Sequence, residues 1–313
     1  MLHVSGAPFR AYPGRPTAGW LLANCFNSGT RWAVPVYLLL SGYLLLGAGR
    51  KESPLDFWRR RAARIALPLL FWGTVYALWN GARSVPEVAL RVLVQANAGY
   101  HLWFLYAMVV LYALAPLLRA LLARLRTVGA IALCAAAFVP FLHLPGVHRL
   151  VHDVPTRWLE LGLPFVGYFL LGGLLRRARA EGRLLPPLLA AAASLAVVVG
   201  GTALATVRQG GLGGRAFQDP LNPAVIALSF SLCLLARRSG DRFPGGRLER
   251  LAPAVLGVYL LHPLVLDLLA RAGVSHARFP WWLAVPALSV LTTAVSLAAV
   301  LGMLRVPLLR RVV

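Results

Sequence analysis

A histidine and a tyrosine stand in the middle of a long apolar stretch near the carboxyl end. The stretch contains G-V-Y-L-L-H-P, so Tyr259 and His262 lie three residues apart and share one face of a helix. Pro263 lacks an N–H, which leaves a carbonyl of the preceding turn free. Because polar groups are costly in an apolar stretch, the pair either packs between helices or lines the path of a polar substrate.

The densest positive charge in the chain is the sequence F-W-R-R-R-A-A-R, which ends at Arg64. Arg61 and Arg64 lie one helical turn apart, so their guanidinium groups could hold phosphates of one ligand. The same cluster is also typical of a cytoplasmic loop that touches anionic lipid heads. Both interpretations stay open at this point.

Histidines also stand at or beside the ends of other apolar stretches. His101 opens one of them, and because Trp103 follows, this end is typical of a membrane interface. An imidazole at such a rim could also orient a hydroxyl-bearing substrate. His148 and His152 have a spacing that suits metal ligands, but no supporting ligand stands nearby, so we expect no metal site.

These residues must be positioned by apolar segments, each about as long as a bilayer is thick. A hydrocarbon core of about 30 Å takes roughly 20 helical residues, and a backbone in lipid must satisfy its own hydrogen bonds, which favours helices. We therefore predict an all-α, polytopic transmembrane helical bundle. The nine predicted spans are Trp32–Gly49, Ile65–Asn80, His101–Leu118, Val128–Leu144, Trp158–Leu175, Leu184–Val207, Asn222–Ala236, Leu251–Ala270 and Trp281–Leu304.

The composition agrees with a membrane protein rather than a nucleic-acid binder. Hydrophobic residues make up 59% of the 313 residues and charged ones 13%, although the net charge is +22. Of the 32 Lys and Arg residues, 21 lie on alternate loops and 11 on the others. This bias follows the positive-inside rule, so we predict that the rich loops and the carboxyl terminus are cytoplasmic. No long linker interrupts the chain, which predicts one integral domain over residues 1–313.

The first residues resemble the last turn of a helix. Nine spans and a cytoplasmic carboxyl terminus place residues 1–31 outside, yet no earlier helix leads the chain there. We therefore expect that most of a first transmembrane helix is missing before His3, through a misassigned start or a truncation.

Five sequence blocks follow one another over residues 34–263. The blocks are Val34-Pro35-Val36-Tyr37 with Ser41-Gly42-Tyr43; Phe57 with Arg61, Arg64 and Pro68; His101-Leu102-Trp103-Phe104-Leu105 with Pro116; Gly167-Tyr168-Phe169-Leu170-Leu171-Gly172; and Tyr259-Leu260-Leu261-His262-Pro263. In this order they resemble the acyltransferase-3 family of integral membrane acyltransferases, most closely the branch that acetylates envelope sugars. The family commonly has ten spans, and its first helix ends in a motif that matches His3-Val4-Ser5.

The resemblance implies transfer of an acetyl or other short acyl group from cytoplasmic acyl-CoA to a hydroxyl of an envelope glycan or lipid-linked sugar. His3 would be the general base, and Arg61 and Arg64 would hold the CoA phosphates. The partners would be acyl-CoA, the acceptor and the bilayer of a bacterial cell (inner) membrane, with no metal and no nucleic acid. The substrate path would be lined by Ser41, Tyr43, His101, Tyr259 and His262.

Two other classes of protein remain open. A transporter or flippase for a sugar or lipid would also line a helical bundle with polar residues, although the inverted repeat typical of carriers is not visible. A purely structural membrane partner would leave the positions of Arg61, Arg64 and His262 unexplained, but this class fits an inactive truncated copy. Binding of free CoA from the cytoplasmic side would distinguish the enzyme from the carrier.

Overall fold

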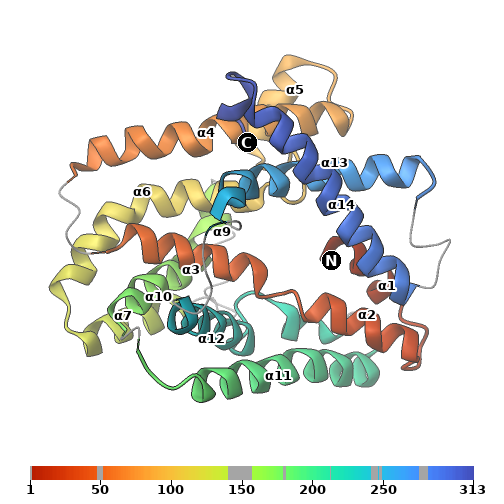
Figure 1. Ribbon diagram of the computed structural model, residues 1–313, viewed down its shortest axis with the longest axis horizontal. Coiled ribbons are helices and arrows are strands. Elements are labelled where there is room, and N and C mark those ends of the chain that lie inside the picture. The colour runs from red at the N-terminus through yellow and green to blue at the C-terminus, as the bar shows by residue number, and fades with distance from the viewer. Residues whose placement is uncertain are drawn as a thin grey trace. The chain divides into compact units, whose positions relative to one another are not determined.

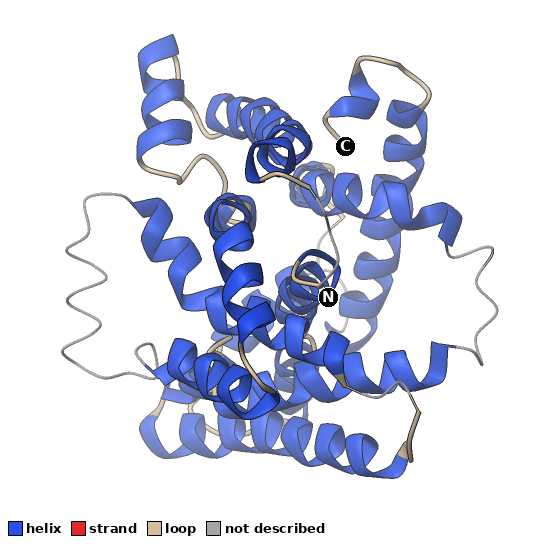
Figure 2. Cartoon of the chain, turned by 90° about the vertical axis from the view of Figure 1, so that its left-hand side faces the viewer, coloured by secondary structure: helices blue, strands red, loops and turns tan. Residues whose placement is uncertain are grey.

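The described part of the chain is helical. The computed structural model describes residues 2–47, 52–139, 157–178, 181–211, 213–240, 246, 249–274 and 281–313. These residues form helices joined by turns and contain no strand (Figure 2). The predicted all-α class is confirmed.

Within the described residues, seven helical segments are long and apolar enough, by length and composition, to cross a membrane. They correspond to seven of the nine predicted spans, and the chain is a multi-pass membrane protein by this measure. The segments are Pro54–Trp79, Trp103–Arg124, Arg157–Arg177, Leu185–Gln209, Gly213–Ser239, Glu249–Arg271 and Trp282–Leu304.

The two remaining predicted spans coincide with shorter apolar helices. α3 (Ala33–Leu45) has 13 residues and α7 (Thr127–Phe138) has 12. Before α3, the turn at Gly29 ends α2 (Ala18–Ser28), and the Thr30 hydroxyl donates to carbonyls of the last turn of α2. Helix α2 was not predicted from the sequence, because its apolar residues alternate with asparagines and a cysteine.

The chain divides into two compact units. Unit 1 contains residues 1–36 and 180–305, and unit 2 contains residues 37–179 and 306–313. In unit 1, α11 lies beside α12, α13 packs on α14, and α1 contacts both α2 and α14 (Figure 1). Besides α2, the helices of unit 1 are α1 (Leu2–Arg10), α11 (Leu185–Gln209), η4 (Gly213–Gln218), α12 (Pro223–Ser239), η6 (Glu249–Ala254), α13 (Val255–Arg271) and α14 (Trp281–Leu304).

In unit 2, α4 runs beside α6, and α10 packs on α6 and α7 (Figure 1). α3 begins in unit 1 and continues into unit 2 from residue 37. Besides α3 and α7, the helices of unit 2 are α4 (Pro54–Trp79), α5 (Val85–Ala89), the π-helix η1 (Leu90–Val94), α6 (Trp103–Arg124), α9 (Arg157–Gly162), η3 (Leu163–Phe165), α10 (Val166–Arg177) and η8 (Leu309–Arg311).

Two glycines let α3 and α10 cross at backbone contact. A Cβ added at Gly42 would overlap the carbonyl oxygen of Phe169, and one added at Gly172 would overlap the carbonyl oxygen of Leu39. Small residues at such crossings are typical of helices packed in membranes. The two glycines belong to separate blocks of the sequence, so this crossing joins those blocks and positions Ser41 and Tyr43 beside it.

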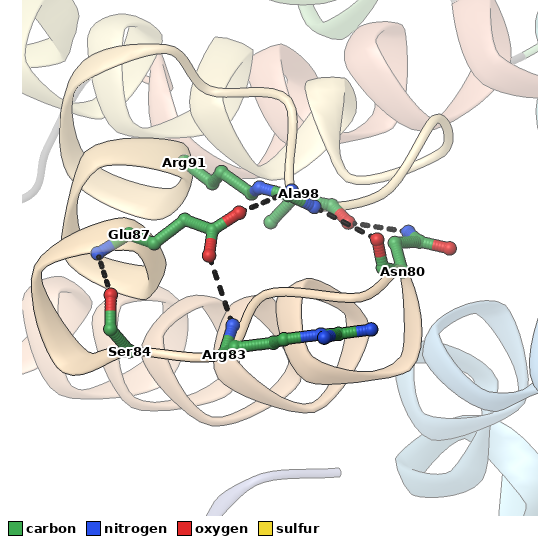
Figure 3. Close-up of polar contacts among 6 residues, drawn as sticks. All are labelled: Asn80, Arg83, Ser84, Glu87, Arg91 and Ala98. Carbon is green, nitrogen blue, oxygen red and sulfur yellow. Dashed lines mark hydrogen bonds and ion pairs between the residues drawn. The ribbon is translucent and has the colours of Figure 1, made fainter.

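Polar side chains organise the connection between α4 and α6. The Ser84 hydroxyl caps α5 by accepting from the N–H of Glu87, and Arg91 donates to Glu87 and to the carbonyl of Asn80 (Figure 3). The backbone N–H of Arg83 also donates to the Glu87 carboxylate at 2.9 Å. That bond and the Arg91 guanidinium hold the pKa of Glu87 below its usual value of 4.5. The connection therefore carries its own polar contacts and leaves the cores of the long helices apolar.

Candidate active site

Unit 1 brings His3 and His262 together from opposite ends of the sequence. The rings of His3 on α1 and His262 on α13 stack with centroids 5.2 Å apart, and the Tyr259 ring lies 6.0 Å from His262. α1 is held in place by apolar packing of Val4 against Val285 and its neighbours on α14. His3 is exposed, so one of its faces is open to a substrate.

Pro263 determines the orientation of His262. In a regular helix the N–H of residue 263 would donate to the carbonyl of Tyr259, but proline has no N–H. The Nδ1 of His262 takes over this carbonyl at 2.7 Å and also lies 3.2 Å from the carbonyl of Val258. Because carbonyls only accept, Nδ1 carries the proton, and Nε2 keeps its lone pair in the neutral ring. The sequence His262-Pro263 therefore leaves Nε2 of His262 as the nitrogen that can accept a proton.

A polar network continues from α1 through α2. Asn27 donates to the hydroxyl of Ser5 at 3.2 Å and to the carbonyl of Leu2 at 3.3 Å, and it accepts from the guanidinium of Arg31. Asn27 and Ser5 are buried at 2% and 0% exposure. Asn27 therefore links the helix that carries His3 to Arg31.

The network extends from Arg31 to η4 and α11. Arg31 donates to the side-chain oxygen of Gln218 at 2.7 Å, and the amide of Gln218 donates to the Ser28 hydroxyl at 2.9 Å. Ser28 donates to Asn24, whose own amide donates to the carbonyl of Val199 on α11 at 2.9 Å. Gln218 and Ser28 are almost fully buried, so these hydrogen bonds satisfy groups that would otherwise be costly.

In unit 2, a buried phenylalanine lies between two arginines. The guanidinium of Arg61 lies 5.6 Å from the centroid of the Phe57 ring, and that of Arg119 lies 5.3 Å from it. Arg119 also pairs with Glu52 at 3.9 Å. Arg64 is exposed one turn beyond Arg61 on α4. The predicted pair is therefore on one helix, with Arg61 packed against aromatic surface and Arg64 open.

A largely apolar groove of about 230 Å³ lies between α4 and α6, and Arg61 is one of its lining residues. The hydroxyl of Tyr112 lies within hydrogen-bonding reach of Ser41, and both Arg61 and Arg64 interact with it electrostatically. The groove is lined by Trp58, Arg61, Ala62, Ile65, Ala66, Val109, Tyr112 and Ala113. The structure thus brings three of the predicted residues, Ser41, Arg61 and Arg64, around one tyrosine that the sequence analysis did not select.

Tyr43 and His101 lie elsewhere in unit 2. The Tyr43 ring lies under the guanidinium of Arg176 at 5.4 Å, beside a cavity of about 220 Å³ that Arg176 and Arg177 help to line. His101 is 2% exposed and contacts the edges of Tyr76 and Tyr100, at 4.6 and 5.5 Å between ring centroids. His101 is therefore packed among aromatic rings rather than open at a rim.

The possible metal ligands His148 and His152 lie outside the described residues. Within the described ranges, no three His, Cys, Asp or Glu side chains are grouped as a metal site would require. The sequence did not single out Asn27, Arg31 and Gln218, because asparagine, arginine and glutamine near apolar segments are common in surface turns. Only the hydrogen bonds of Gln218 to Arg31 and Ser28, residues about 190 positions away, distinguish these side chains from ordinary surface residues.

The fold and these side chains define a multi-pass helical membrane protein with an imidazole pair in one unit and an arginine–aromatic cluster in the other. The family model described as an acyltransferase domain matches residues 1–301, nearly the whole chain. The protein belongs to the acyltransferase-3 family, so the predicted family is confirmed, and membership implies acyltransferase activity. Neither the curated proteins nor the solved structures provide a match.

Proposed function

We propose that the protein transfers an acetyl or other short acyl group from cytoplasmic acyl-CoA to a hydroxyl of an envelope glycan or lipid-linked sugar. The observation that carries this proposal is the His3–His262 stack, in which an exposed imidazole adjoins a second imidazole of defined tautomer. The family match extends over residues of both units, which supports treating residues 1–313 as one catalytic domain.

In the proposed reaction His3 is the general base. It removes the proton of the acceptor hydroxyl as that oxygen attacks the thioester carbonyl carbon. The carbon–sulfur bond then breaks, the ester forms on the acceptor, and the CoA thiolate leaves and takes up the proton. His262 and Tyr259 would position the His3 ring and the acceptor.

The donor would bind to unit 2. Arg64 is exposed and Arg61 lines the apolar groove, so the two guanidinium groups suit phosphates of CoA. The groove suits the less polar pantetheine arm. Ser41 and Tyr112 would flank this arm, while Tyr43 and His101 would shape the path through the packing of α3 and α6.

A carrier for a sugar or lipid is the competing function. A carrier has no need of the CoA nucleotide, so competition by free CoA separates the two. We expect the purified protein to bind free CoA, and Arg64→Ala to weaken this binding about tenfold through loss of a charge-assisted contact. Arg59→Ala is the control, since Arg59 is an exposed arginine on the same helix.

The deciding experiment compares acetyl ester on envelope glycans between host cells with the unaltered chromosomal gene and cells with His3→Ala. We expect loss of the ester by a factor of about 10² to 10⁴ in rate at an unchanged protein level. Arg10→Ala, an exposed change on the same helix, should keep the ester. Normal ester with His3→Ala would exclude His3 as the base.

A further inference from the structure

Arg31 is a half-buried arginine whose hydrogen-bond partners among the described residues are neutral. Its guanidinium donates to the side-chain oxygens of Asn27 and Gln218, which are amides. Its Nε is buried and has no hydrogen-bond partner in the described part of the chain. Two amide oxygens orient the group, but they do not neutralise its charge.

The nearest charged groups leave this region positive. Asp219 and Arg215 are close enough to interact electrostatically with Arg31. Within the described ranges, however, no carboxylate oxygen of Asp219 comes within ion-pair distance, and that carboxylate accepts from the N–H of Leu221 at 2.7 Å. The groups that act on Arg31 are therefore a second arginine and one aspartate, and the aspartate already accepts a backbone hydrogen bond. A desolvated guanidinium without an ion pair favours an anionic ligand.

Arg31 is also linked to the helix that carries the proposed base through one intervening side chain. Asn27 connects its guanidinium to Ser5 and to the carbonyl of Leu2, which flank His3 on α1. Arg31 and His3 are near enough to interact electrostatically. A ligand held by Arg31 would therefore place its neighbouring atoms beside His3.

We propose that Arg31, oriented by Asn27 and Gln218, is an anion subsite for the acyl acceptor. The acceptor then carries a negatively charged oxygen group, either the carboxylate of an acidic sugar or the phosphate of a phosphorylated or lipid-linked sugar, close to the hydroxyl that is acylated. This inference rests on the proposed function for the identity of the ligand as acceptor, but the anion subsite itself can be tested by binding.

The test measures thermal stabilisation of the purified full-length protein in detergent by three probes at matched concentration: glucose, glucuronate and glucose 6-phosphate. We expect glucuronate or glucose 6-phosphate to stabilise the protein and glucose to have little effect. A larger shift with glucuronate identifies a carboxylate acceptor, and a larger shift with glucose 6-phosphate identifies a phosphate acceptor. Equal shifts with all three probes, or none with either anion, would overturn the proposal.

Two variants and a control locate the binding. Arg31→Gln should weaken anion binding about tenfold or more, the usual effect of losing a charge-assisted hydrogen bond. Gln218→Glu should do the same without loss of folding, because it places a carboxylate on Arg31 and occupies the subsite internally. Arg15→Gln, an exposed change in the same unit, should keep the binding. Anion binding that survives in Gln218→Glu at normal stability contradicts the assignment.

The binding test and the ester test fail independently. If Gln218→Glu loses anion binding and His3→Ala retains the ester, Arg31 is an anion subsite and His3 is not the base. If Gln218→Glu retains anion binding and His3→Ala loses the ester, His3 is the base and Arg31 is not an anion subsite.

Discussion

Arg31 and Arg119 are both partly buried arginines, and their surroundings differ. Arg119 pairs with the carboxylate of Glu52 and lies over the ring of Phe57, and its side chain is 12% exposed. Arg31 is held by two neutral amides. A charge paired within the protein contributes to structure, whereas an oriented charge without an ion pair is available to a ligand. The comparison distinguishes a structural arginine in unit 2 from a binding one in unit 1.

The two units also hold their helices together by different means. In unit 1 a series of hydrogen bonds through Asn27, Gln218 and Ser28 links α1, α2 and η4. In unit 2 the crossing of α3 and α10 relies on backbone contact at Gly42 and Gly172. We expect unit 2 to be sensitive to added volume and unit 1 to be sensitive to lost polar atoms.

The largest effect should come from added volume at the crossing. Gly172→Val places three carbon atoms where the carbonyl of Leu39 already lies, so α10 must move away from α3. We expect severe loss of folded protein, measured as the yield of monodisperse protein after purification. Gly200→Val is the matched control, because a Cβ at that exposed helical glycine meets no other atom within 4 Å. Equal yields for both variants would show that the protein still folds when α3 and α10 are moved apart.

A smaller effect should follow from removing the structural arginine. Arg119→Gln leaves Glu52 paired only with Arg60 among its described ion pairs and exposes one face of Phe57. We expect the Tm to fall by about 3 to 5 °C, while the affinity for CoA stays within about twofold because Arg61 and Arg64 remain. A normal Tm with weakened CoA binding would show that Arg119 binds the donor. Arg119 would then be a ligand-binding arginine, as is proposed for Arg31, and not a structural one.

The smallest effect should come from Pro263→Ala. Alanine supplies an N–H that can donate to the carbonyl of Tyr259, in competition with Nδ1 of His262. We expect kcat to fall by about two- to tenfold through a less well-defined imidazole, with an unchanged or higher Tm because the helix gains a bond. The measurement is the kcat of acyl transfer over a pH series. An identical pH profile and kcat would show that this bond does not set the orientation of His262.

Some parts of the site were predictable because they depend on neighbouring residues. The freed carbonyl near His262 follows from Pro263 alone, and the spacing of Arg61 and Arg64 follows from one helical turn. The His3–His262 stack was not predictable from spacing, because it joins residues near opposite ends of the chain. Tyr112 was missed because a tyrosine inside an apolar helix carries no signal of its own.

Hydropathy and charge along the sequence determined that this protein is helical and multi-pass, and the five ordered sequence blocks predicted the acyltransferase-3 family. These properties depend on short segments, since burial in lipid and hydrogen bonding within a helix are decided locally. Tertiary structure alone decided which polar groups meet. It placed Gln218 on Arg31 and Gly172 on Leu39, because contacts between helices distant in sequence depend on packing that no local pattern encodes.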